Sequence, residues 1–236
     1  MDTFNTQTSR GPSGLRRVKR RMTTQDLVYE QFRDALIAGR FEAGHGFTIS
    51  ALAEQFGTSH MPVREALRRL AAENALSIGT SGTAMVPLTS TDDLDFLCQT
   101  RCILEGAAAE LAAGRVDPVM LNRLETVART HVEALRDGAS DLMLASNREF
   151  HFAVYEAAGN PVIVTLIQNL WLRYGPYVRL LSDRMTDLLI RDSAGSYSQH
   201  HEALIAALRT GDGKGAGAAI VGDIRATQSL LHRFCG

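Results

Sequence analysis

"TSHMPVREALRRLAAENAL", residues 58–76, is the stretch that decides the fold of the front of this chain. Pro62 suits the first turn of a helix, where its missing N–H costs no hydrogen bond. Apolar residues then recur at helical spacing and form one stripe, made by Val63, Ala66, Leu67, Leu70 and Ala71. The stretch therefore predicts a helix that carries Arg64 and Arg68 one turn apart, opposite the stripe.

Two further helices are predicted before this stretch, over residues 24–38 and 50–56, because both segments carry apolar residues at helical spacing. After the stretch, Gly79 and Gly82 flank the tip of a small β-hairpin. Three helices with a tight turn before the last one, followed by a hairpin, make a winged helix-turn-helix. We assign this domain to residues 23–88.

The face that carries Arg64 and Arg68 admits two interpretations. The second helix of a helix-turn-helix lies in the major groove and contacts base edges with its N-terminal residues, so both arginines are expected to face DNA. Alternatively the face is merely solvated, and Glu65 and Arg69 form an ordinary ion pair one turn apart. The pattern alone leaves both open.

The charge of the chain is unevenly distributed. Residues 1–88 hold 11 Lys and Arg against 8 Asp and Glu, whereas residues 89–236 hold 14 against 18. A mildly basic front and an acidic back fit a DNA-binding head on a body with another task. Residues 1–22 are polar, with a basic run from Arg16 to Arg21, and are predicted to form a disordered arm that is either solvated or lies on phosphates.

Residues 89–236 are predicted to form an all-α bundle, so the chain as a whole is mostly α. Short connections join the segments, and no convincing strand occurs among them. The six expected helices cover residues 91–113, 117–137, 140–158, 161–182, 197–210 and 213–233.

Cysteine content and hydropathy favour a cytoplasmic protein with no membrane partner. The three cysteines form no disulfide framework and no Cys-x-x-Cys spacing, and Cys98 and Cys102 are predicted to be core residues. The first residues lack an apolar signal segment. No apolar run approaches the roughly 18 residues that a membrane span requires.

The segment "LAEQFGTSHMPVREALRRLAAENAL" (52–76) resembles the winged helix-turn-helix signature of the GntR family of bacterial transcription regulators, most specifically in "PVREALRRL" (62–70). The resemblance implies DNA contacts from the start of the recognition helix and from the wing tip, by Ser59, His60, Met61, Arg64 and Gly82. Position 60 is usually arginine in this family. His60 cannot make the bidentate contact of a guanidinium with guanine, so the resemblance does not imply the operator sequence.

Three later segments resemble the FCD effector-binding domain of the FadR-like branch of the same family. They are "DDLDFLCQTRCILEGAAAEL" (92–111), "NREFHFAVYEAAGNPVI" (147–163) and "HHEALIAALRTGD" (200–212). The resemblance implies a helical domain that binds a small organic acid and forms a homodimer. It therefore implies a dimer that binds a palindromic, double-stranded operator.

Many FCD domains hold a metal ion at the centre of the bundle, and the resemblance identifies the matching positions here. Asn147 stands where an aspartate is usual, His151 and His201 match two histidines, and Asp223 stands where a third histidine is usual. Two imidazoles and one carboxylate suit Zn²⁺, Ni²⁺ or Mn²⁺. The alternative is that both histidines are hydrogen-bonded interior residues of a metal-free pocket.

An anionic effector needs positive charge in its pocket, and Arg101 and Arg173 are the candidates for a bidentate contact with a carboxylate. Trp171, Tyr174 and Tyr177 are candidates for the pocket wall. Each of these residues could equally be core or surface. His131 and His232 have no metal-ligand pattern and are predicted to be surface or structural residues.

The favoured function is a transcription regulator that responds to a ligand. It is expected to be a repressor that its effector releases from DNA. One rival is a metal-dependent enzyme on a helical bundle, which would need a general base beside the metal. Glu149 is two residues from His151 and is therefore expected on another face of the helix. The other rival is a DNA-binding protein without an effector, for which a second domain of this size is unnecessary.

Overall fold

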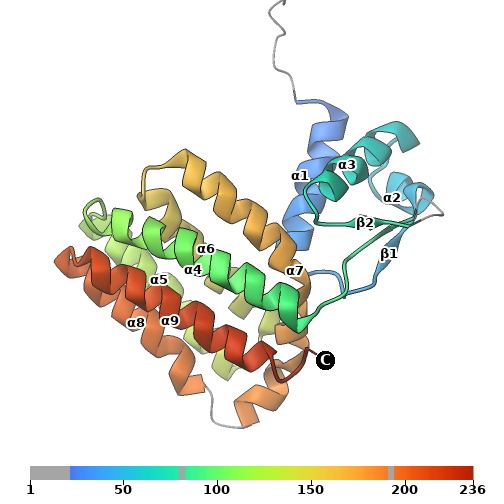
Figure 1. Cartoon of the computed structure of the whole chain (residues 1–236). Coiled ribbons are helices and arrows are strands. Elements are labelled where there is room, and N and C mark those ends of the chain that lie inside the picture. Colours follow the sequence, from blue (N-terminus) through green and yellow to red (C-terminus); the bar gives the residue numbers. More distant parts are fainter. Residues whose placement is uncertain (1–21, 80–82, 191–193, 236) are drawn as a thin grey trace, which may run out of the picture.

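The computed structural model describes residues 22–79, 83–190 and 194–235, and Figure 1 shows a winged head beside a helical bundle. The head consists of α1 (Thr24–Ile37), β1 (Gly46–Phe47), α2 (Ile49–Gln55), α3 (His60–Ala72), β2 (Ser77–Ile78) and β3 (Ala84–Met85). The body consists of α4 (Thr91–Ala113), α5 (Pro118–Arg136), α6 (Ser140–Ala157), α7 (Pro161–Ile190), α8 (Ala194–Thr210) and α9 (Gly213–Leu231). Most of the predicted basic arm (1–21) and Gly82 lie outside the described residues.

The head forms around the apolar stripe that the sequence predicts on α3. Val63 and Leu70 are fully buried, and α3 packs mainly against α1 and also against α2. A capping box starts α1, in which Thr23 accepts a hydrogen bond from the Asp26 amide and Asp26 accepts one from the Thr23 amide. The three predicted helices and their order are confirmed.

The wing is larger than the predicted hairpin. Strands β2 and β3 do pair, but β1 joins them on the other side of β3, which gives a three-stranded antiparallel sheet in the order β1-β3-β2. Phe47 of β1 is buried edge-to-face against Phe32 of α1, with ring centroids 4.8 Å apart. The sheet is thereby fixed to the helical part of the head.

The body is the predicted bundle of helices. Helix α4 packs against α9, α5 packs against α6, and α8 packs against α9. Side chains cap the starts of α4, α5, α7 and α9, where Ser90, Asp117, Asn160 and Asp212 accept backbone N–H groups. Helix α7 continues to Ile190, beyond the predicted end at residue 182. None of the described helices combines the length and hydropathy that a membrane span requires.

Head and body meet where the end of α1 lies on the middle of α7 (Figure 1). A Cβ atom added to Gly175 of α7 would overlap the carbonyl oxygen of Leu36, so the two backbones touch there. Two polar contacts flank this point. Arg33 donates to Gln168 at 3.3 Å, and Arg148 pairs with Asp34 at 3.1 Å. We call this contact between α1 and α7 the seam.

Candidate functional site

The start of α3 presents the side chains that the sequence assigned to DNA contact. Ser59 is the N-cap residue of α3 but makes no capping hydrogen bond with its side chain. Ser59, His60, Met61 and Arg64 are all exposed. The only side-chain contact found for Arg64 within the described residues is a long one, 3.7 Å from its Nη1 to the sulfur of Met61.

The other two arginines of α3 are held by carboxylates. Arg68 is exposed and pairs with Glu65 at 2.8 Å. Arg69 pairs with Glu73 at 3.4 Å, and its guanidinium lies 3.5 Å from the ring centroid of Tyr29. The Glu65–Arg69 pair of the alternative interpretation does not form, because Glu65 pairs with Arg68 instead. Arg69 ties α3 to α1, whereas Arg64 and Arg68 remain on the exposed face.

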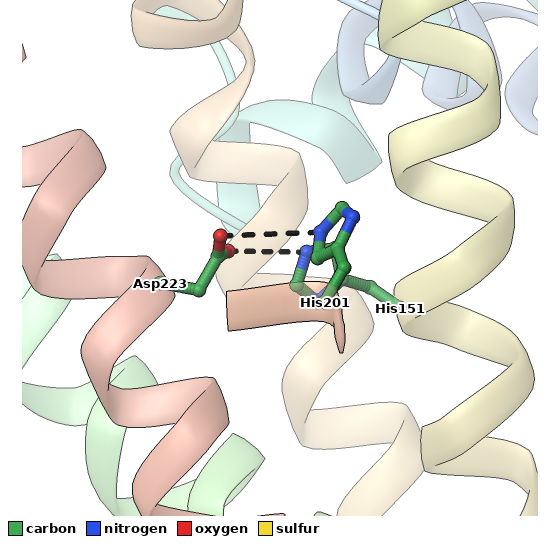
Figure 2. Close-up of side chains that lie close together, drawn as sticks. All are labelled: His151, His201 and Asp223. Carbon is green, nitrogen blue, oxygen red and sulfur yellow. Dashed lines mark ion pairs between the residues drawn. The ribbon is translucent and has the colours of Figure 1, made fainter. Parts of the chain in front are cut away.

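Three of the four predicted metal ligands, one each from α6, α8 and α9, come together in the bundle, whereas the fourth, Asn147, is not part of this group. His151 Nε2 lies 3.2 Å from one carboxylate oxygen of Asp223, and His201 Nε2 lies 3.9 Å from the other (Figure 2). One donor atom from each residue lies within 4.8 Å of the other two. In a tetrahedral site, two ligand atoms at about 2.1 Å from the ion lie about 3.4 Å apart. A pair at the outer limit of 4.8 Å would therefore have to approach by about 1 Å to hold such an ion.

The protonation of this cluster also fits a cation. Burial lowers the pKa of His201 to about 3, so its imidazole is neutral at pH 7. Burial alone would raise the pKa of Asp223, but the hydrogen bond from His151 and the nearby positive charges lower it to about 2. Among the described residues, neither ring nitrogen of His201 has a hydrogen-bond partner although both are buried. An ion would satisfy one of them.

The remaining nitrogen of His151 belongs to a buried chain of hydrogen bonds. His151 Nδ1 lies 3.0 Å from the hydroxyl of Tyr155, and that hydroxyl donates to Glu105 at 2.5 Å. Glu105 also accepts from Arg101 Nε at 2.7 Å and from Trp171 Nε1 at 3.0 Å. The metal-ligand cluster and a buried ion pair are thus continuous.

A cavity of about 940 Å³ reaches this cluster from the side of the head. His151, Asp223 and Asn147 line it, together with Arg33 and Arg40 from the head. His201 instead borders a second cavity of about 610 Å³ between α5 and α8. The cluster therefore separates the two cavities, and the larger one is open to a small molecule that contacts both domains.

Three of the four predicted effector contacts line the larger cavity, and one does not. Arg101, Trp171 and Tyr174 line the larger cavity. Arg101, however, is only 4% exposed, and Glu105 already occupies its Nε and Nη2. Arg173 is exposed on α7 and is not among the residues that line the cavity, so its expected place in the pocket is wrong.

The sequence also misplaced one wall candidate and did not identify several residues that line the cavity. The hydroxyl of Tyr177 donates to the carbonyl of Ser90, outside the cavity wall. His131 is a structural residue, as expected, but it is buried at the cavity wall with Nδ1 3.1 Å from the Met143 carbonyl. Tyr155 follows His151 by four residues, so helical spacing was a signal that could have placed it beside the ligand. No comparable signal marks Arg33 and Arg40.

The buried histidines predict how the stability of the metal-free protein depends on pH. Burial lowers the pKa of both His131 and His201 below the ordinary 6.5. As the pH falls through 6.5, the unfolded chain therefore binds more protons than the folded chain, and stability decreases. Between pH 6.5 and 5.5 we expect a loss of about 1 kcal/mol from His201 and a further loss from His131. Urea unfolding with a chelator present measures it.

The matched control for this prediction is His201→Asn, which should keep only the loss that comes from His131. Equal free energies of unfolding at pH 6.5 and 5.5 in the unaltered protein would show that both imidazoles accept protons as freely in the folded chain as in the unfolded one.

A winged head with an exposed recognition helix, joined to a helical bundle with an internal cavity, defines a DNA-binding transcription regulator. Comparison with known proteins agrees. Two family models match the chain, "Bacterial regulatory proteins, gntR family" over residues 24–85 and "FCD domain" over residues 96–226. The chain belongs to the GntR family, in the FadR-like branch that carries an FCD domain.

Relatives of known name cover most of the chain. HTH-type transcriptional regulator McbR of Escherichia coli (strain K12) is 30% identical over 188 residues, which are 80% of this chain and 83% of that protein. "Probable D-xylose utilization operon transcriptional repressor" of Paenarthrobacter nicotinovorans is 31% identical over 202 residues, 80% of this chain and 82% of that protein. The solved structure of E. coli McbR/YncC covers 92% of this chain and 100% of that one, with a TM-score of 0.83 and 27% identity.

Proposed function

We propose that this chain is a cytoplasmic repressor that binds a palindromic operator as a homodimer and is released by a small organic acid. The observation that carries the proposal is the larger cavity, which is lined both by His151 and Asp223 of the metal-ligand cluster and by residues of the head. A ligand there would contact the domain that binds DNA. Coupling between two such sites is typically worth about 1–3 kcal/mol.

DNA contact is assigned to Ser59 just before α3, to His60, Met61, Arg64 and Arg68 on α3, and to Gly82. Arg64 is the main base-reading side chain in this assignment, because within the described residues no carboxylate holds its guanidinium. A guanidinium without such a partner can form the bidentate contact with guanine without first breaking an ion pair. Arg68 would have to leave Glu65 or use its remaining N–H groups.

The effector is proposed to bind beside a divalent ion that His151, His201 and Asp223 would hold, with Asn147 close by on the same face of α6. When bound, the ion would offer coordination positions for a carboxylate and a neighbouring oxygen of the effector. Trp171 and Tyr174 would supply the apolar wall. Positive charge for an anion comes from Arg33 and Arg40 rather than from Arg101, whose charge Glu105 balances.

The seam is the proposed route from effector to DNA. Asp34 and Arg148 line the cavity and form the ion pair that joins α1 to α6. An anion near Arg148 would compete with Asp34 for this cation. The end of α1 would then change its position on α7, and the separation of two heads in a dimer would change with it.

The experiment begins with genomic DNA fragments selected by the purified protein and footprinted. We expect two inverted half-sites, and sedimentation velocity should give a dimer both free and on DNA. Binding is then measured with Zn²⁺ and with L-lactate, D-gluconate or N-acetyl-L-glutamate as probe acids. A probe that fits should weaken operator binding by about 5- to 150-fold.

Asp34→Asn is the matched variant for the effector response. It keeps the size of the side chain and removes the ion pair that the acid would break. Operator binding should therefore already be weaker without the acid, and the further response to the acid should decrease. A monomer on an asymmetric site would overturn the dimer. Turnover of any probe acid would instead favour the enzyme, although Glu149 is exposed and pairs with Arg123 at 2.9 Å.

A further inference from the structure

The chain of hydrogen bonds behind His151 has a direction that follows from its chemistry. Glu105 is completely buried and faces donors from three other residues, Arg101, Trp171 and Tyr155. Arg101 and Trp171 have only N–H donors in these contacts, so the carboxylate of Glu105 accepts from both. The hydroxyl of Tyr155 can also donate to it. At 2.5 Å between the oxygens, this is a short, charge-assisted hydrogen bond.

Because Tyr155 donates its only proton to Glu105, its oxygen can only accept from its other neighbour. That neighbour is Nδ1 of His151, at 3.0 Å. The imidazole therefore carries a proton on Nδ1, and its Nε2 faces Asp223.

The opposite side of the ring agrees with this arrangement. Nε2 of His151 lies 3.2 Å from an oxygen of Asp223, so this oxygen can accept a hydrogen bond from Nε2 in the metal-free protein, and an ion would take the place of that proton. Histidines that bind a metal through Nε2 commonly donate their Nδ1–H to an acceptor on the other side of the ring. Here the acceptor is a phenol that is itself held by a buried ion pair.

We propose that Tyr155 is a positioning residue for the metal, because it fixes the proton of His151 on Nδ1 and leaves Nε2 for the ion. The inference rests on the proposed metal site and deepens it. Glu105 holds the Tyr155 proton, and Arg101 balances the charge of Glu105. Arg101 thus supports the ligand His151 from behind, rather than binding the effector.

The test compares Tyr155→Phe with Tyr177→Phe in the full chain. Both variants remove the hydroxyl group of a buried tyrosine, but the Tyr177 hydroxyl forms hydrogen bonds with the backbone of Ser90 and not with the cluster. Competition with a chromophoric chelator gives the dissociation constant for Zn²⁺. We expect Tyr155→Phe to bind Zn²⁺ about 10- to 100-fold more weakly and Tyr177→Phe to bind it like the unaltered protein.

A second readout uses the unaltered, metal-free protein and therefore needs no variant to fold. Nitrogen-15 NMR of the histidine rings should show a proton on Nδ1 of His151, and with zinc it should show coordination through Nε2. A bare Nδ1 overturns the proposal, as does a Tyr155→Phe variant with full zinc affinity. An unaltered protein that takes up no zinc, nickel or manganese overturns the proposed metal site itself, a result that the chelator assay separates from the other two.

Discussion

Replacing Glu105 by glutamine is expected to destabilise the protein by about 3–5 kcal/mol, which is the usual cost of leaving one member of a buried ion pair without its partner. Arg101 would keep its charge in the interior, where only 5% of its side chain is exposed. The amide nitrogen of glutamine would also face donors rather than accept from them. Thermal and urea unfolding measure the loss, which corresponds to a melting temperature lower by about 10 °C.

Glu125→Gln is the matched control for this variant. Glu125 also pairs with an arginine, Arg209, but both side chains are about half exposed. Surface pairs contribute about 0–1 kcal/mol, so this variant should unfold almost like the unaltered protein. Equal losses in the two variants would mean that the Arg101–Glu105 pair has no special role in the body.

Replacing Arg64 by alanine should weaken specific operator binding by about 100-fold or more. Each bidentate contact with a base is worth about 1–3 kcal/mol, and a dimer would lose two of them. Binding to DNA without the operator should change much less, since that interaction depends on the phosphate charge. Fluorescence anisotropy with operator and scrambled duplexes, at several salt concentrations, measures both.

Two neighbouring arginines serve as controls for Arg64. Arg68→Ala should weaken operator binding by about 10-fold, because the lost cation was already paired with Glu65. Arg69→Ala should leave specificity unchanged and lower stability, because Arg69 stacks on Tyr29 and pairs with Glu73. If Arg64→Ala binds the operator normally, the recognition helix does not contact DNA in the way proposed.

The order of the helices could be predicted because their apolar stripes and stop signals are local. Helix α4 has the predicted bounds, whereas α7 continues past residue 182, since no glycine or proline ends it there. Strand β1 has two residues, too few for an alternating pattern to reveal. Its place depends on pairing with β3, which local sequence does not encode.

The site was predictable where one helix supplies the spacing. The four-residue step from Asn147 to His151 put two candidates on one face of α6, but the approach of His201 and Asp223 depends on how α8 and α9 pack. The resemblance to FCD domains supplied that part. The sequence made Arg101 a candidate for the effector pocket. Its four-residue spacing to Glu105 was visible, but the burial of both side chains as an ion pair depends on packing that local sequence does not encode.

The backbone contact at the seam limits how freely the two halves of such a regulator can be exchanged. Position 175 admits no side chain while the carbonyl of Leu36 lies against it, and Gly39 at the end of α1 would place a Cβ 2.9 Å from the backbone nitrogen of Arg179. Head and body are therefore not interchangeable modules. A chimera that grafts a new DNA-reading head onto this sensor has to bring the residues at the end of its first helix as well as those that touch DNA.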